Sequence, residues 1–459
     1  MQIEQKLANY VATTRLEQMP SNAVEVVRHI LMTVLGTAVA GAQEVGVQEV
    51  LAVYGTPPGS QSARALVYGT HMPPASAAAV NGLMARALDY CDAMAPGLHI
   101  GSSLVTAALA AAEARGGCNG KDFLSALVVG AELASRMNLS EQSYAGLDPT
   151  GVAGIFGATA AAARVFELDE VQTQNALALA FNRCSGSFQS NIDGSLAVRM
   201  IQGWVAGDGV NCALLARAGL SGPENFISGV YGYGTLYAKD ADFKDRVTHA
   251  LGEEYKVLGT MFKKYPSCGM TQGATELMLR MQLRNGFDAT RVSHVDVRVP
   301  GYGFRLVGHE FVLGSNPRVN AQFSLQFCIA NALIRKSSTL EHFKPSNVNN
   351  PDIMSFCKRV HVYHDEALDK REHTSVAVSV VMQDGQKWED FLDIAPGFPG
   401  NPITVQEHAD RFAACFAYAG RTEISMLALK TQIESIEECD DVSSLIDFTL
   451  NNELSIPRK

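Results

Sequence analysis

The spacing of apolar residues predicts helices through the first half of the chain. Between residues 22 and 40, apolar side chains recur every three or four positions, as on the buried face of a helix. The same spacing predicts four further helices, over residues 103–114, 123–137, 155–166 and 174–181. Alanine and glycine dominate several of these stretches, and small side chains let helix axes approach closely. We therefore expect a tightly packed helical bundle.

The pattern changes after Pro266. Valines alternate with polar residues at 295–299, 360–362 and 376–380, which is typical of strands with one buried face. Asp384-Gly385 follows the last of these stretches and favours a hairpin turn. We expect a small antiparallel sheet here, packed beside helices such as one over residues 320–334.

Residues 404–445 again have a helical pattern, so this segment is expected to return to the first domain. The prediction is a mainly α protein. Residues 1–262 and 397–459 would form one large all-helical domain, and residues 263–396 a smaller α+β lid domain. Asp169 is expected to cap the helix that follows it.

Composition narrows the possible classes of function. Hydrophobic residues make up 47% of the 459 positions and charged residues 18%, which is typical of a globular protein. A net charge of −10 without a basic tract argues against a nucleic-acid partner. No stretch reaches the roughly 18 uninterrupted apolar residues of a membrane span, and the first residues lack a secretion signal. We expect a cytoplasmic protein with no membrane partner.

The nine cysteines include no CxxC pair. This favours reduced thiols and argues against a zinc or iron–sulfur site, so no metal is expected. Because the whole chain is acidic, an anionic substrate would need a local pocket of a few arginine and lysine side chains.

Asp89, Asp92 and His99 are the first candidates for chemistry. The two aspartates lie three residues apart, so on a helix they would project from one face and could orient an imidazole. They could equally well only end a helix. His99 precedes a Gly-Ser-Ser run in which a serine could cap the next helix, and its near-neutral pKa suits proton transfer.

A second candidate group is the KKYPSC motif, with Lys263, Lys264, Tyr265 and Cys268. A lysine could bind a substrate carboxylate as a point charge, and the tyrosine could donate a hydrogen bond to it. The alternative is two solvated lysines at a domain junction. Cys268 could be a thiol acid or a small packed side chain.

Further along the chain, Arg305 and Arg318 flank a glycine-rich loop that carries Tyr302. Either arginine could clamp a carboxylate with two parallel hydrogen bonds. We include all three among the candidate substrate-binding residues.

The segment ALDYCDAMAPGLHIGSSLVTAALAAAE resembles the MmgE/PrpD family, in which an acidic turn precedes a histidine and an alanine-rich helix. Further matching runs follow in order along nearly the whole chain: GKDFLSALVVGAELASR, PTGVAGIFGATAAAARVFELDEVQTQNAL, GWVAGDGVNCALLARAGLSGP, KKYPSC, NAQFSLQF and APGFPGNPIT. The resemblance implies a large helical domain with a smaller α+β lid, in a homodimer.

Members of this family dehydrate 2-methylcitrate, decarboxylate cis-aconitate or epimerise iminodisuccinate, without a metal or organic cofactor. The resemblance implies the same kind of chemistry here, on a small anionic carboxylic acid. It places Asp89 on the family's active-site aspartate and His99 on its catalytic histidine. It also favours Lys263 as the inward lysine of the KKYPSC motif.

This chain departs from the decarboxylase-like members at several positions. Asp148, in GLDPTG, replaces a histidine, and Gln272 replaces a later one. Val198 and Ile201 replace a lysine and a second histidine, and Ala93 replaces a threonine. The loss of these cations suggests a smaller or less charged substrate than a tricarboxylate.

Two of the changed regions offer substitutes. Arg199, beside the lost lysine, could restore a positive charge, although adjacent residues on a helix point in different directions. Asp148 could serve as a different base, provided that burial raises its pKa.

We expect a cofactor-independent lyase, a dehydratase or decarboxylase, that works by acid–base catalysis. His99 would be the general acid or base, and Asp89 would orient it. An isomerase or epimerase is the first alternative, with His99 and Asp148, or Lys263 and Tyr265, on opposite faces of one carbon. The second alternative is an inactive paralogue that binds a metabolite.

Overall fold

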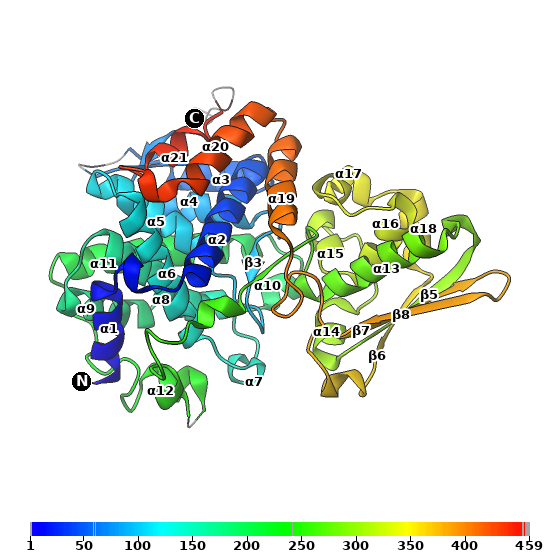
Figure 1. Ribbon diagram of the computed structural model, residues 1–459, viewed down its shortest axis with the longest axis horizontal. Coiled ribbons are helices and arrows are strands. Elements are labelled where there is room, and N and C mark those ends of the chain that lie inside the picture. Colours follow the sequence, from blue (N-terminus) through cyan, green and yellow to red (C-terminus); the bar gives the residue numbers. More distant parts are fainter. Residues whose placement is uncertain (1, 58, 60, 241, 452–453, 455–459) are drawn as a thin grey trace.

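The structure is a computed structural model that describes residues 2–57, 59, 61–240, 242–451 and 454. Figure 1 shows a large helical body beside a smaller region that contains the main sheet. The protein is mainly α, as the sequence predicts. The domain boundaries at residues 263 and 396 stay a prediction.

Long helices build the body, and their positions confirm the helices predicted from apolar spacing. Two buried helices, α4 and α11, pack along each other near its centre. The main helices are α2 (Ser21–Gly41), α4 (Pro74–Arg86), α5 (Gly101–Arg115), α6 (Gly120–Met137), α8 (Ile155–Val165), α9 (Glu170–Phe181) and α11 (Ala197–Arg217). Asp169 caps α9 as predicted, because its carboxylate accepts the backbone N–H of Gln172 at 2.8 Å.

Small residues allow the close approach of α4 and α11. A Cβ added at Gly203 of α11 would lie 2.4 Å from the carbonyl oxygen of Ala79 on α4. A Cβ at Gly82 of α4 would lie 3.0 Å from the carbonyl oxygen of Gln202. Any larger side chain at Gly203 would force the two backbones apart.

Helix α2 has the length and hydropathy of a membrane span, the one such helix among the residues that the structure describes. Most of its side chains are buried inside the protein, against α4 and α19 (Val405–Tyr418). It is therefore placed as a core helix of the body.

The main sheet has the strand order β6-β5-β7-β8. Its strands are β5 (Val292–Val299), β6 (Val360–His364), β7 (Val376–Met382) and β8 (Lys387–Leu392). The predicted hairpin at Asp384-Gly385 joins β7 to β8, with Gly385 at φ +84°. Helices α13 (Gln272–Asn285) and α16 (Leu325–Arg335) pack against the sheet and enclose a second apolar core.

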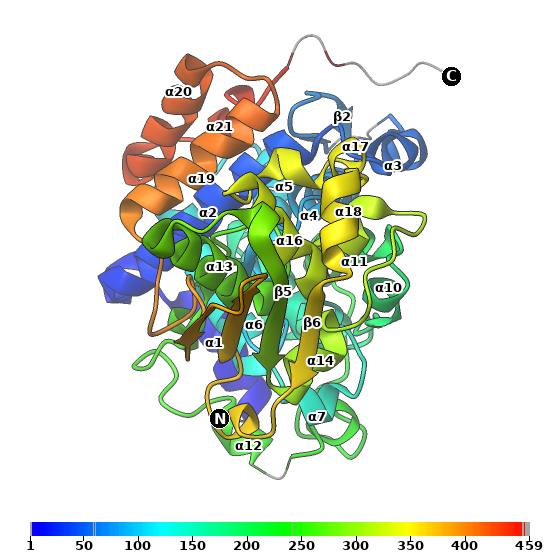
Figure 2. The same cartoon turned by 90° about the vertical axis from the view of Figure 1, so that its right-hand side faces the viewer.

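Two expectations for this region are wrong. The sheet is mixed, because β5 and β6 are parallel; Figure 2 shows them side by side in front of the helical body. The helices between these strands carry the chain back to the end at which β5 starts, which a hairpin does not do. The helix expected over 320–334 is also broken, because Ser324 caps α16 by accepting the N–H of Phe327 at 3.2 Å.

The C-terminal helices return to the body. Phe412 and Phe416 of α19 lie in the large apolar core beside α2. Helices α20 (Glu423–Glu434) and α21 (Ser444–Asp447) follow on the same side of the molecule (Figure 1).

Shorter elements complete the fold. They are α1 (Ile3–Thr13), α3 (Val47–Tyr54), α7 (Glu141–Tyr144), α10 (Gln189–Ile192), α12 (Phe243–Arg246), α14 (Gly301–Val307), α15 (Pro317–Gln322), α17 (Pro345–Val348), α18 (Pro351–Cys357), β1 (Ala63–Arg64), β2 (His71–Met72), β3 (Asp92–Ala93) and β4 (Met261–Phe262).

The antiparallel pairing of β3 with β4 positions the candidate site. Asp92 lies opposite Phe262, and Ala93 opposite Met261. This pairing brings the loop after α4, with Asp89 and His99, beside the KKYPSC motif that begins at Lys263.

Candidate active site

A cavity of about 660 Å³, including its open mouth, lies where these two segments meet. Its walls come from the loop between α4 and α5, from α10 and α11, from the KKYPSC segment and from α14. The polar lining residues are Arg86, Asp89, His99, Asp148, Asn191, Gln202, Lys263, Cys268, Tyr302 and His373.

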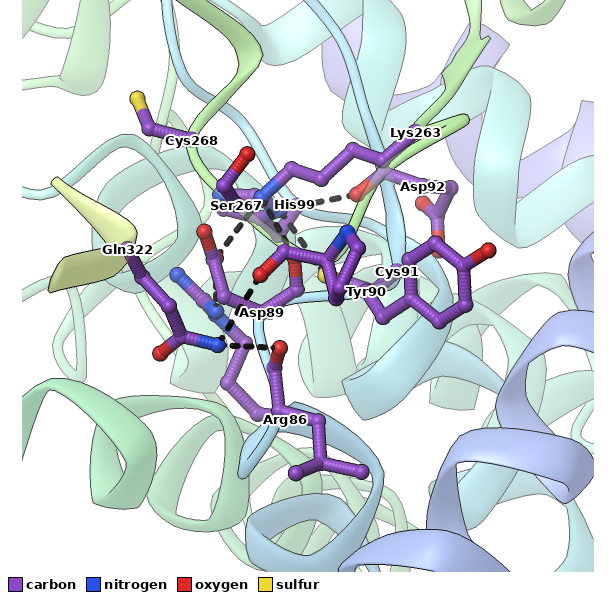
Figure 3. Close-up of polar contacts among 12 residues, drawn as sticks. Arg86, Asp89, Tyr90, Cys91, Asp92, His99, Lys263, Ser267, Cys268 and Gln322 are labelled. Atoms are coloured by element: carbon purple, nitrogen blue, oxygen red, sulfur yellow. Dashed lines mark hydrogen bonds and ion pairs between the residues drawn. The ribbon is translucent and has the colours of Figure 1, made fainter. Parts of the chain in front are cut away.

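Asp89 lies between two cations on one side of the cavity (Figure 3). Lys263 Nζ is 2.7 Å from Asp89 Oδ1, and Arg86 pairs with the same oxygen. Burial would raise the pKa of Asp89, but the charges of Arg86 and Lys263 outweigh it and lower that pKa to about 2. The cluster therefore carries one net positive charge.

The local backbone explains why Asp89 faces this cluster. Helix α4 ends at Arg86, and Asp89 has φ +51°, in the left-handed region. Lys263 Nζ also donates to the Asp89 carbonyl oxygen at 3.1 Å, which stabilises this turn. The expectation that Asp89 and Asp92 share one helical face is therefore wrong, because no helix connects them.

Asp92 caps the next helix instead. Its Oδ2 accepts the backbone N–H groups of Ile100 at 3.1 Å and Gly101 at 2.9 Å, at the start of α5. The predicted serine cap is wrong, because Ser103 donates its hydroxyl to the Ile100 carbonyl oxygen. Asp92 does not line the cavity, and its carboxylate holds α5 in place.

His99 is held with one ring nitrogen toward the protein. Its Nδ1 lies 2.8 Å from the carbonyl oxygen of Asp92 and, since a carbonyl only accepts, Nδ1 carries the proton. None of the residues that the structure describes hydrogen-bonds Nε2. Burial and the charges of Arg86 and Lys263 lower the pKa of His99 well below its usual value. At neutral pH the ring is neutral, with Nε2 available as a base.

Asp148 lies near His99 on the cavity wall. Its Oδ1 accepts the N–H of Thr150 at 2.8 Å, and burial raises its pKa above the ordinary value. The hydroxyl oxygen of Thr150 accepts the backbone N–H of His99 at 3.1 Å and a hydrogen bond from the side-chain amide of Gln202 at 3.0 Å. Thr150 therefore binds the backbone of His99 and the carboxylate of Asp148, and so fixes the positions of the two candidate proton carriers relative to each other.

The KKYPSC motif divides between the cavity and the surrounding packing. Lys263 is 2% exposed and points inward, as the family resemblance implies. Lys264 forms ion pairs of 3.0 Å with Glu276 and Glu407, and the Tyr265 hydroxyl donates to Glu276 at 2.5 Å. Lys264 and Tyr265 therefore lie outside the cavity lining and fasten the motif to α13 and α19.

Three other candidates differ in position. The Gln272 side chain bonds the backbone N–H and carbonyl of Tyr265, so it stabilises the turn and stays outside the cavity lining. Cys268 lines the cavity, and burial raises the pKa of its thiol to about 11, which keeps it protonated. Tyr302 also lines the cavity and donates its hydroxyl to the Pro96 carbonyl oxygen at 2.5 Å.

The arginines singled out from the sequence do not line this cavity. Arg199 donates to the Val45 carbonyl oxygen at 3.0 Å, and Arg318 pairs with Glu44 at 3.0 Å. Arg305 is exposed and pairs with Glu141 at 2.7 Å. Their side chains reach other partners in the fold.

The arginine that lines the cavity is Arg86, which was not among the candidates from the sequence. It lies three residues before Asp89 at the end of α4, a spacing that allows an ion pair. This signal was available in the sequence. Gln202 and His373 also line the cavity, without a sequence pattern to mark them. Among the residues that the structure describes, no group of three His, Cys, Asp or Glu side chains is arranged to hold a metal ion.

Comparison with known proteins gives matches along most of the chain. The MmgE/PrpD N-terminal domain model matches residues 5–246, and the C-terminal domain model matches residues 265–432. A cis-aconitate decarboxylase of Homo sapiens is 22% identical over 395 residues, covering 82% of this chain and 80% of that protein. A cis-aconitate decarboxylase of Aspergillus terreus is 23% identical over 464 residues, covering 94% and 91%.

Proposed function

The chain belongs to the MmgE/PrpD family, and on that basis we propose that it is a lyase that acts on a small polycarboxylic acid by acid–base catalysis. The names of its relatives support a lyase on a carboxylic acid, and the cavity supports a site for one.

One observation carries the proposal. A neutral His99, with its Nε2 free, lies beside a cluster in which Arg86 and Lys263 share one acidic partner, Asp89. The excess positive charge attracts a substrate carboxylate, and the free imidazole nitrogen can take a proton from the carbon next to that carboxylate.

In the dehydratase form of the reaction, His99 Nε2 removes a proton from this carbon. The electron pair of the broken C–H bond is delocalised into the carboxylate, where Lys263 and Arg86 stabilise the added charge. The pair then forms a C=C bond as hydroxide leaves from the neighbouring carbon. The His99 imidazolium, which has just taken up the proton of the C–H bond, then gives a proton to the hydroxide and turns it into water.

In the decarboxylase form, the C–C bond to a carboxylate breaks and carbon dioxide leaves, so the carbon that keeps the electron pair needs a proton donor. The resting imidazole cannot serve as that donor, because its pKa lies well below 6.5. Protonated Asp148 or the Cys268 thiol would have to supply the proton. We therefore favour the dehydratase form.

A panel of hydroxylated and unsaturated di- and tricarboxylic acids tests the proposal. The purified protein should release water or carbon dioxide from at least one of them, seen by ultraviolet absorbance of the new double bond or by carbon dioxide capture. Absence of turnover throughout the panel, together with thermal stabilisation by the same acids, would instead favour a metabolite-binding paralogue. Full activity on cis-aconitate would contradict the proposed preference for a smaller or less charged acid.

An epimerase is the second candidate, because His99 and Asp148 both line the cavity and could act on opposite faces of one carbon. The alternative pair, Lys263 and Tyr265, has less support, since the Tyr265 hydroxyl is bound to Glu276 outside the cavity lining. Deuterium uptake from solvent into the substrate, without elimination, would favour the epimerase.

The family resemblance extends the proposal to the state in which the protein works. We propose a homodimer in the cytoplasm that needs no metal or organic cofactor. The mass of the protein in solution tests the homodimer. Its activity after dialysis against a chelator tests the independence from a metal.

A further inference from the structure

A second cavity adjoins the catalytic one. It measures about 700 Å³, including its mouth, and shares four wall residues with the inner cavity: Pro96, Phe188, Tyr302 and Leu306. The four shared side chains therefore form the boundary between the two cavities, which are direct neighbours.

The outer cavity is mainly apolar. Tyr144, Ile192 and the shared Phe188 and Leu306 form its walls, and the ion pair of Glu141 with Arg305 lies on its lining. Ile192 is 57% exposed in the absence of a ligand. An exposed apolar side chain in a concave wall favours an apolar occupant, since burying it removes apolar surface from water.

The inner cavity, in contrast, has few positive charges. Arg86 and Lys263 are the only lysine or arginine side chains in the described part of its lining, and Asp89 already neutralises one of them. Asp148 adds a second acid to the same wall. A substrate with three carboxylates would place at least one of them beside an acid, without a cation to bind it.

From these two observations we propose that the substrate is a dicarboxylate at most and carries an apolar tail. Lys263 and Arg86 bind at most one carboxylate each, the carbon beside the bound carboxylate faces His99, and the tail passes Phe188 and Leu306 into the outer cavity. This inference rests on the proposed function, because it uses the same carboxylate site. It adds that the acid has an apolar tail and at most two carboxylates.

Binding of three probes to the full-length protein, measured by calorimetry, tests the inference. They are methylsuccinate, 2-octylsuccinate and citrate. Each methylene that leaves water increases affinity roughly fourfold, so 2-octylsuccinate should bind at least about tenfold more tightly than methylsuccinate. Citrate should bind more weakly than methylsuccinate, because its third carboxylate finds no cation.

Ile192→Asp and Val230→Asp form a matched pair of variants. Ile192 lines only the outer cavity, whereas Val230 is 80% exposed and lines neither cavity. Ile192→Asp should remove most of the preference for the octyl chain, because the new charge lies against the tail. Val230→Asp should keep the preference at the wild-type level.

The outcomes separate the tail from the carboxylate site. Equal affinity for 2-octylsuccinate and methylsuccinate, or an unchanged preference in Ile192→Asp, would overturn the proposal that an apolar tail binds in the outer cavity. The proposed function would still stand if Lys263→Gln lost the binding of methylsuccinate. Tighter binding of citrate than of methylsuccinate would overturn the limit of two carboxylates. If no acid binds, the carboxylate site and the tail both fail.

Discussion

At the scale of single residues, the proposed chemistry depends on the tautomer of His99. The Asp92 carbonyl oxygen accepts the proton of Nδ1, so only Nε2 can act as a base. Burial and two neighbouring cations keep the ring neutral. In the proposed mechanism, His99 can therefore accept a proton only through Nε2.

Replacement of His99 by Asn should lower turnover at least about a hundredfold, because general base catalysis by a positioned imidazole contributes of order 10²–10⁴. Binding of methylsuccinate should change little, since Arg86 and Lys263 remain. His249→Asn, at an exposed histidine outside the cavity lining, is the control and should keep wild-type turnover. Near-normal turnover of the His99 variant would mean that another group carries the proton.

The pH dependence of kcat/KM should follow the lowered pKa of His99. The base form is lost as pH falls through that pKa, so the acid limb should lie well below pH 6.5. Lys263→Gln removes a charge that lowers the His99 pKa, so the limb of its residual activity should move to higher pH. Lys264→Gln, whose ammonium binds Glu276 and Glu407, should leave the limb in place. An acid limb near pH 6.5 in the wild type would contradict this assignment.

Sequence motifs singled out His99, Asp89 and Lys263, and the structure places all three on one cavity. The arginines were harder to assign. A residue beside a motif need not point into the site, and Arg199 and Arg318 bind partners elsewhere. Only the fold shows where a long side chain ends.

At the scale of elements, the site depends on the β3–β4 pairing and on the start of α5. Asp92 belongs to β3, and its carboxylate binds the first N–H groups of α5 while its carbonyl oxygen binds His99. One residue therefore joins a strand, a helix and the candidate catalytic ring. In the proposed mechanism, Asp92 is a positioning residue.

Asp92→Ala should lower the free energy of unfolding by about 1–2 kcal/mol, as expected for the loss of a helix cap. It should also lower kcat, because the loop that holds His99 loosens. Asp169→Ala removes the cap of α9, outside the cavity lining, and is the matched control. Denaturant unfolding and turnover are measured on both variants. A loss of stability without a loss of kcat in the Asp92 variant would contradict its positioning role.

The apolar spacing predicted the long helices well, because each buries one continuous face. It did not predict the break at Ser324 or the parallel pairing of β5 with β6. A serine cap within an apolar stretch resembles an ordinary helical residue, and the direction of a strand depends on the path of the chain between strands.

At the scale of the whole molecule, the C-terminal helices complete the body. The prediction that residues 404–445 pack back against the first helices agrees with the position of Phe412, which is 2% exposed beside α2. Phe412→Asp should therefore prevent stable folding or lower the free energy of unfolding by several kcal/mol, since it buries an unpaired charge. Ile424→Asp, at an 80% exposed position of α20, should have little effect. Equal stability of the two variants would contradict this packing.

The site itself lies between the helical body and the sheet region, so neither region holds it alone. The body supplies Arg86, Asp89, His99 and Asp148, and the KKYPSC segment beyond β4 supplies Lys263. Only the family resemblance assigned these segments to one site, because no local sequence pattern indicates a contact between Asp89 and Lys263, which are 174 positions apart.

A crystal structure of the protein with bound methylsuccinate tests the central claim most directly. We predict one carboxylate within hydrogen-bond distance of Lys263 or Arg86, and the carbon beside it facing His99 Nε2. An acid bound outside this cavity, or His99 turned with Nε2 away from the ligand, would contradict the account.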